Sequence, residues 1–177
     1  MVVKMSKESK LKIFLLASLW LFIAIVASIS IVNKSEAKIV KCTGETGKVL
    51  IVKSMKQLTI LDTSGCIIKQ YDNIRIGKNP GPKQCDGDKR TPEGKYHIVE
   101  KRDSKYHRFL AINYPNADDI KKAKELGCKP GDSIGIHSWK PGLPKEGSLG
   151  CITVWSKKDI LEIDSLVEVG TEVEIRK

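Results

Sequence analysis

IGIHS at residues 134–138 is followed, nine residues later, by SLGCI at residues 148–152. The apolar residues before His137 predict a buried strand that ends near this histidine, and Gly150 places Cys151 at the end of a loop rich in Pro and Gly. A cysteine becomes a nucleophilic thiolate at neutral pH when a base or a cation lies beside it. Fourteen residues separate the histidine from the cysteine, which is too far for one helix face but within reach of a folded loop. We therefore interpret the two residues as a base and nucleophile pair.

The rest of the chain predicts a mainly β domain with two short helices. Short runs rich in β-branched residues, separated by turn signals, favour antiparallel strands. NADDIKKAKELG at residues 116–127 predicts a helix with Asn116 as its N-cap, and Ser156 with Asp159 resembles the capping box of a second helix. The Pro- and Gly-rich segment 78–90 predicts a functional loop. The expected strands are 48–52, 57–62, 66–71, 95–101, 108–113, 133–136 and 172–176.

The N-terminal segment, residues 1–37, predicts a signal anchor. Four lysines precede Ile13–Val32, a run of 20 residues without a charge. A bilayer span needs about 20 apolar residues, whereas the apolar part of a cleaved signal peptide has about 7–15. The length favours an uncleaved transmembrane helix in the inner membrane, and Ser35-Glu36-Ala37 makes a cleaved signal peptide the alternative. In both cases we expect residues 38–177 to form one domain on the periplasmic or cell-wall face, because the positive flank stays inside.

The charge of the chain favours an anionic partner. The formal net charge is +10, of which residues 1–37 contribute +3, so the expected domain carries +7. A lysine-rich soluble surface would give the same balance. The basic residues are not interleaved with aromatic ones, and we therefore expect no nucleic-acid partner.

The cysteine content fits an exported domain with two disulfides and one free thiol, which we expect to be Cys151. The other four cysteines allow three pairings. A zinc site formed by Cys128, His137 and Cys151 is the weaker alternative, because it lacks a closely spaced ligand pair. We expect no metal and no cofactor. The five cysteines are Cys42, Cys66, Cys85, Cys128 and Cys151.

Acyl transfer by Cys151 would need an oriented base and donors for an oxyanion. No acid lies close in the sequence, so the backbone carbonyl of Ser138 is the expected partner that fixes the tautomer of His137. Gly150 permits a close approach of the backbone to a substrate, and the amide groups of Gly150 and Cys151 are the expected oxyanion donors. The competing interpretation of Cys151 is a buried, inert thiol.

Several segments resemble the L,D-transpeptidase catalytic domain (YkuD-like) family. IHS followed by SxGCI resembles its active-site signature, and RTPEGKY at residues 90–96 resembles its R-T-P-E-G-x-Y segment. INYPN at residues 112–116, together with residues 123–131, is similar to the YafK-like murein subgroup. The resemblance extends from about Lys48 to Ile175.

The resemblance implies a β-sandwich-like fold and acyl transfer on peptidoglycan stem peptides, after a diamino acid, through a thioester. It implies Cys151 as the nucleophile, His137 as the base and Ser138 as the source of the orienting carbonyl. The expected function is an L,D-transpeptidase that cross-links the cell wall or attaches protein to it, and so contributes to cell-wall biogenesis and cell shape. The alternatives are a murein hydrolase that releases a peptidoglycan-linked lipoprotein or peptides, and a non-catalytic cell-wall binding module. The further residues implied at the oxyanion or substrate are Gly150, Thr153 and Arg90.

Two positions depart from the family pattern. Leu149 stands where the family often has histidine, and Thr153 stands where many members have arginine or asparagine. An arginine at that position would hold a substrate carboxylate. The acceptor of the acyl group is therefore harder to predict than the nucleophile.

The presumed groove also favours one disulfide arrangement. Cys85 in the 78–90 loop and Cys128 after the first helix both flank this groove. We expect these two cysteines to pair, with Cys42–Cys66 as the other disulfide.

Overall fold

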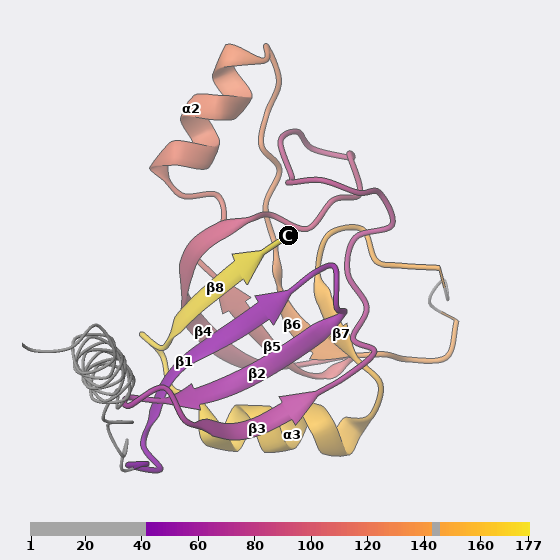
Figure 1. The fold of residues 1–177 in the computed structure, drawn as a ribbon. Coiled ribbons are helices and arrows are strands. Elements are labelled where there is room, and N and C mark those ends of the chain that lie inside the picture. Colours follow the sequence, from indigo (N-terminus) through magenta and orange to yellow (C-terminus); the bar gives the residue numbers. More distant parts are fainter. Residues whose placement is uncertain (1–41, 143–145) are drawn as a thin grey trace, which may run out of the picture. The chain divides into compact units, whose positions relative to one another are not determined.

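The computed structural model describes residues 42–142 and 146–177 (Figure 1). The anchor or signal peptide expected at residues 1–37 lies outside the described residues and stays a prediction. Within the described part of the chain, no helix is both long enough and apolar enough to cross a bilayer.

The described residues form one eight-stranded sheet and two helices. The strands are β1 (Thr46–Val52), β2 (Gln57–Asp62), β3 (Ile67–Tyr71), β4 (Gly94–Ser104), β5 (His107–Ile112), β6 (Gly135–Ser138), β7 (Ile152–Val154) and β8 (Glu172–Arg176). The helices are α2 (Ala117–Glu125) and α3 (Lys157–Leu166). Across the sheet the order is β3-β2-β1-β8-β4-β5-β6-β7. The predicted mainly β fold with two short helices is confirmed.

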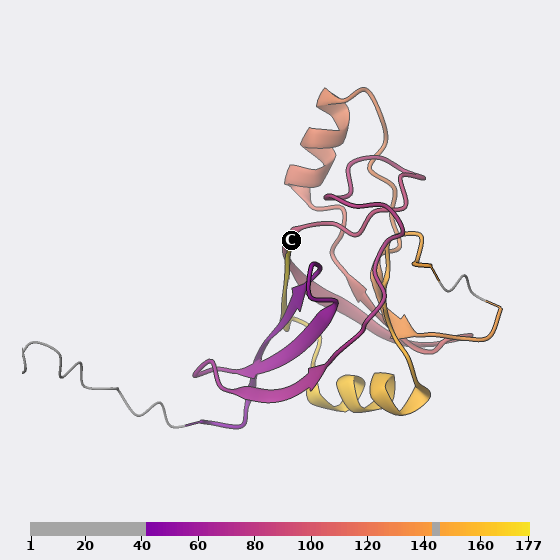
Figure 2. The same cartoon turned by 45° about the vertical axis from the view of Figure 1, so that its right-hand side comes forward.

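The expected sandwich-like arrangement takes the form of one continuous sheet that changes direction at β4. The first part of this long strand, Gly94–His97, pairs with β8, and the part from Ile98 to Ser104 pairs with β5. A β-bulge interrupts the register between Ile98 and Glu100, and bulges increase the local twist and bend of a strand. In Figure 2 the β1–β3 part of the sheet and the later strands accordingly face different directions.

The first three strands pair antiparallel, as predicted, but the sheet as a whole is mixed, so the expectation does not hold for every pair. β1 runs parallel to β8, and β6 runs parallel to β7. Parallel neighbours need a connection of about a dozen or more residues. The segment 139–151 provides one between β6 and β7, and it ends at Cys151. The short spacing of the first three strands, on which the expectation was based, does not extend to this part of the chain.

The two edges of the sheet nearly meet, because the segment after β3 reaches β7. The amide of Arg75 donates to the carbonyl of Thr153 at 2.8 Å, and the amide of Thr153 donates to the carbonyl of Arg75 at 2.7 Å. The next contact along the chain joins Ile76 and Ser148, whose amide donates to the Ile76 carbonyl at 2.8 Å. These bonds place residues 75–77 beside the loop that carries Cys151.

Both helices begin at the predicted caps. Asn116 caps α2 and Ser156 caps α3, each in a capping box with the aspartate three residues later. α3 lies beneath the sheet in Figure 2 and packs against β5 and β6. Its side chains Ile160 and Ile163 are fully buried in the core. Fully buried residues on the strands include Ile51, Leu58, Ile98, Leu110, Ile136 and Ile152.

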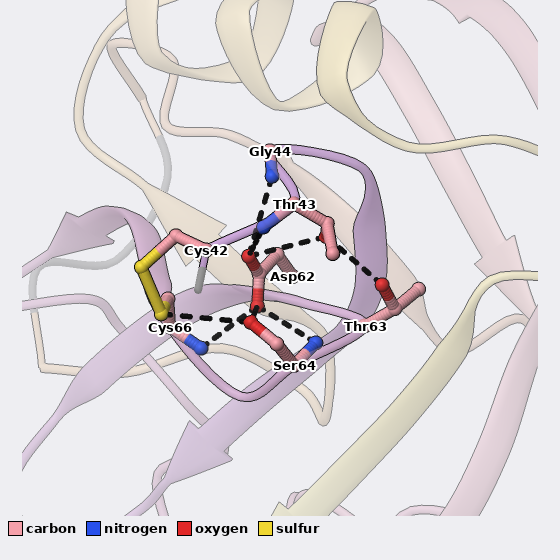
Figure 3. Close-up of a disulfide and its surroundings, with 7 residues drawn as sticks. All are labelled: Cys42, Thr43, Gly44, Asp62, Thr63, Ser64 and Cys66. Carbon is pink, nitrogen blue, oxygen red and sulfur yellow. Dashed lines mark hydrogen bonds between the residues drawn. A yellow bond between two sulfur atoms is a disulfide. The ribbon is translucent and has the colours of Figure 1, made fainter. Parts of the chain in front are cut away.

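Both expected disulfides, Cys42–Cys66 and Cys85–Cys128, are present. Beside the first of them lies the buried carboxylate of Asp62 (Figure 3). Its hydrogen-bond donors are the amides of Thr43, Gly44, Ser64 and Cys66 and the hydroxyl groups of Thr43 and Ser64. The hydroxyl of Ser64, followed by these amides, holds the pKa of Asp62 well below its ordinary value of 3.8, against the effect of burial. The disulfide and the carboxylate together fix the start of the described chain to the β2–β3 turn.

Replacing Asp62 with asparagine is expected to lower the midpoint of thermal unfolding near pH 7. The amide carries no charge, and its NH₂ group, which only donates, replaces one of the two oxygens that accept these hydrogen bonds. The pKa of Asp62 is lower in the folded state, so its stabilisation is complete well above pH 3.8 and is lost as the pH falls below that value. The difference in midpoint between the wild type and Asp62→Asn should therefore shrink between pH 7 and pH 3. Asp72→Asn is the matched control, because Asp72 is exposed and accepts only from two glutamine side chains. A difference independent of pH would contradict this role of the Asp62 charge.

Candidate active site

His137 and Cys151 line one cavity of about 810 Å³. The segment after β3, the 78–90 loop, the β4–β5 hairpin and the residues around Cys151 contribute to its walls. Five basic side chains line it against two acidic ones, Asp86 and Asp132, so the cavity favours anionic ligands. The basic residues are Arg75, Lys83, Lys89, Arg102 and Lys105.

His137 is fixed in orientation by its neighbours. It lies on β6 and is only 6% exposed. Its Nδ1 atom is 2.9 Å from the carbonyl oxygen of Ser138, which can only accept, so Nδ1 carries the proton and Nε2 is left as the basic atom. Tyr106 stacks on the imidazole with ring centroids 4.4 Å apart, and Phe109 stacks at 5.8 Å. The hydroxyl of Ser138 donates to the carbonyl of Tyr106 at 2.8 Å, which ties the tip of the β4–β5 hairpin to the same strand.

The surroundings of His137 keep it neutral. Burial lowers the pKa of the imidazole below 6.5, and the nearby charge of Arg75 lowers it further, while the hydrogen bond to Ser138 acts in the opposite direction. A neutral imidazole with a free Nε2 atom can accept a proton at pH 7. This is the protonation state that a general base requires.

Cys151 is the free cysteine of the chain, because the other four form the two disulfides. Its Sγ atom donates to the carbonyl of Ser133 at 3.4 Å. Burial raises the pKa of the thiol above 9.0, while the amide of Gly135 and the charge of Lys83 counteract part of this effect. The resting thiol is therefore protonated at pH 7. Its proton has to turn from Ser133 to the histidine before the sulfur can act as a nucleophile.

Gly150 occupies a position that only glycine fits. Its φ is +145°, and a Cβ atom would lie 2.8 Å from Cδ1 of Ile134 and 2.9 Å from the backbone oxygen of Arg90. Its amide donates to Oγ of Ser148 at 3.0 Å, and its carbonyl accepts from the hydroxyl of Thr91 at 2.8 Å. Of the two expected oxyanion donors, the amide of Gly150 is thus already engaged, and the amide of Cys151 is the better candidate. A serine two residues before a glycine is the local signal that could have indicated this turn.

The other predicted site residues lie at different distances from the cavity. Thr153 lines it and is buried, with its backbone paired to Arg75. Leu149 lies at the rim with 75% of its surface exposed. Arg90 is not among the described residues that line the cavity, and its guanidinium donates to the side chain of Gln84 at 3.2 Å. A substrate-binding role for Arg90 stays a prediction.

The sequence interpretation missed Arg75, Tyr106 and Lys83. All three line the cavity, and they come from a bridge segment, a hairpin tip and an irregular loop. None of these residues belongs to a local motif that would single it out. The alternative zinc site is excluded, because Cys128 forms a disulfide with Cys85.

A known protein family matches most of this chain. The L,D-transpeptidase catalytic domain family (YkuD) matches residues 46–175. YafK of Escherichia coli strain K12, whose name marks it as a candidate L,D-transpeptidase, is 36% identical over 73 residues. That match covers 40% of this chain and 27% of YafK.

Solved structures show the same fold. The helical cell shape determining protein Pgp2 from Campylobacter jejuni superimposes with a TM-score of 0.61 at 24% identity, covering 75% of this chain and 48% of Pgp2. Bd1075 of Bdellovibrio bacteriovorus gives a TM-score of 0.56 at 24% identity, covering 74% of this chain and 48% of Bd1075. The chain thus spans about half the length of these two proteins and about a quarter of YafK.

Proposed function

Because the chain belongs to the L,D-transpeptidase catalytic domain family (YkuD), we propose that it is a cysteine acyltransferase that acts on peptidoglycan stem peptides. The observation that carries the proposal is the shared cavity, in which His137 presents a neutral, oriented imidazole and Cys151 is the free thiol. The excess of basic side chains around the cavity fits a peptide that carries several carboxylates.

The first half of the reaction forms a thioester. Nε2 of His137 takes the proton from Sγ of Cys151, and the thiolate attacks the carbonyl carbon of the diamino acid that precedes the terminal D-alanine. The amide of Cys151 donates to the resulting oxyanion. The C–N bond then breaks, the D-alanine nitrogen takes the proton from His137, and the peptide stays bound to the sulfur as a thioester.

The second half of the reaction decides the product. An amine from a second stem peptide, or from a protein to be attached, gives a cross-link and regenerates the thiol. Water at the same step gives a shortened peptide, which would make the protein a murein hydrolase that releases peptides or a peptidoglycan-linked lipoprotein. The acyl-enzyme is common to both outcomes.

We further propose that the protein works on the periplasmic or cell-wall side of the inner membrane. The two disulfides fit an oxidising compartment, and residues 1–37 carry the pattern of an anchor or signal peptide. Peptidoglycan lies in the same compartment. This placement links the activity to cell-wall biogenesis and to cell shape.

The full-length protein, incubated with muropeptides that carry tetrapeptide stems, is expected to release D-alanine and to form cross-linked dimers. The measurement is mass spectrometry of the muropeptides, with lipoprotein-linked sacculi as a second substrate. Release of D-alanine or of lipoprotein without any cross-link would identify the hydrolase. Unchanged muropeptides, together with the absence of a covalent acyl adduct on Cys151, would contradict both enzyme functions. The remaining candidate would then be the cell-wall binding module.

A further inference from the structure

Arg75 is a buried cation in the wall of the catalytic cavity. It is only 7% exposed, and it lines the cavity together with Cys151 and His137. Its backbone is fixed by the two hydrogen bonds to Thr153, which lies two residues after the nucleophile. The charge of the guanidinium contributes to the lowered pKa of His137, which places Arg75 electrostatically close to the reacting groups.

The other buried cations of the described chain form ion pairs with carboxylates. Arg75 forms none. Burial lowers the pKa of its guanidinium, and the charge of the more distant Glu146 raises it by a smaller amount. Lys53 is 2.9 Å from Glu93, and Lys83 is 3.0 Å from Asp88. Within the described residues, no carboxylate oxygen lies within ion-pair distance of Arg75. Burial of an unpaired charge is costly, and such a group is normally kept for a charged ligand or a functional role.

The hydrogen-bonding capacity of Arg75 is also largely unused. Its buried Nε atom has no partner among the described residues, and one terminal nitrogen reaches the carbonyl of Gly147 only at 3.5 Å. The guanidinium lies 5.4 Å from the ring centroid of Trp155, which supports the planar group without neutralising it. Arg75 is therefore held in place and still has N–H groups to offer.

We propose that Arg75 binds a carboxylate of the stem peptide next to the scissile bond, and so is a specificity-determining residue of this site. The inference rests on the proposed function for the identity of the ligand. Two carboxylates lie near that bond, one on the terminal D-alanine and one on the side chain of the diamino acid. A guanidinium offers two parallel N–H groups to a carboxylate, which a lysine ammonium cannot reproduce.

The test is a binding measurement that does not depend on turnover. The full-length protein with Cys151→Ala is titrated with a tetrapeptide, with its terminal amide and with its diamino acid side-chain amide, by calorimetry. We expect the free acid to bind about 10–100-fold more tightly than one of the two amides, as for a charge-assisted pair. Adding Arg75→Gln should abolish this preference, because it should weaken the binding of the free acid and leave that of the poorly binding amide unchanged. The position of the amide group in the poorly binding peptide shows which carboxylate Arg75 binds.

Lys89→Gln is the matched control, because Lys89 is an exposed cation of the same cavity. It should weaken the acid and both amides similarly and keep the preference. Arg75→Lys keeps the charge and should reduce the preference partly, so it carries the test if Arg75→Gln does not fold. A preference that survives both Arg75 variants, or the absence of any preference, would overturn the inference. The proposed function fails on a different result, which is a wild-type protein that forms no acyl-enzyme.

Discussion

Alanine in place of Cys151 is expected to abolish acyl-enzyme formation and to reduce the turnover of stem peptides by a factor of about 10³ or more. The other four cysteines are held in disulfides, so the described chain offers no second thiol to replace it. Intact-protein mass spectrometry provides the measurement. After incubation with a carbapenem-type acylating agent, the wild type should gain one adduct per chain, located on Cys151, and the variant should gain none.

Cys151→Ser is the matched control for this experiment. Its hydroxyl keeps the size of the side chain and can donate to the carbonyl of Ser133, so the fold should be retained. A serine next to a neutral imidazole is a much weaker nucleophile than cysteine, and the adduct should be lost in this variant as well. An adduct that persists in Cys151→Ala would show that another residue is the nucleophile.

Glutamine in place of His137 is expected to lower the rate of acylation by a factor of about 10²–10⁴, as for the loss of a general base. The pH dependence should change at the same time. In the wild type the pKa of His137 lies below 6.5, so the imidazole is still neutral, and able to act as a base, at pH 6.5. The rate should fall only when the pH drops below that value and the imidazole becomes protonated. In the variant the sulfur has to ionise unaided, and the residual rate should rise above pH 9.0 because burial raises the pKa of Cys151.

His97→Gln is the control for the histidine experiment. His97 is exposed on β4, and its backbone rather than its ring makes the contacts with Asn113. Its replacement should leave both the rate and the pH profile unchanged. A wild-type acid limb above pH 6.5, or a His137→Gln profile with the same shape as the wild type, would contradict the role of His137 as the base.

The sequence predicted the local features of the fold well, because local rules determine them. The strands follow runs of β-branched residues, and Asn116 and Ser156 cap their helices through side chains that bond to amides two or three residues away. The direction of β8 beside β1 could not be predicted in the same way. The end of β1 at Val52 and the start of β8 at Glu172 are separated by 119 residues. The pairing of the two strands therefore depends on how the whole intervening chain folds.

The site was predictable to a similar extent. His137 and Cys151 stand out because their chemistry is recognisable in a short segment, and their partner Ser138 is adjacent in sequence. Arg75 looks like any residue of a short apolar run until its segment pairs with Thr153. The role of Tyr106 depends on a hairpin tip that bends over β6, which no periodicity reveals. Long-range packing, rather than residue type, decides these positions.

The Cys85–Cys128 disulfide connects the cavity to the redox state of the surrounding compartment. It joins the 78–90 loop to the segment after α2, and one backbone hydrogen bond, from Asp86 to Lys129 at 2.7 Å, lies beside it. Both connected segments contribute to the cavity, through Asp86 and Asp132. The disulfide joins two cysteines that are 43 residues apart, and neither of them belongs to the hydrophobic core. Reduction of this disulfide would remove the covalent link between two walls of the cavity, and an oxidising compartment would maintain it.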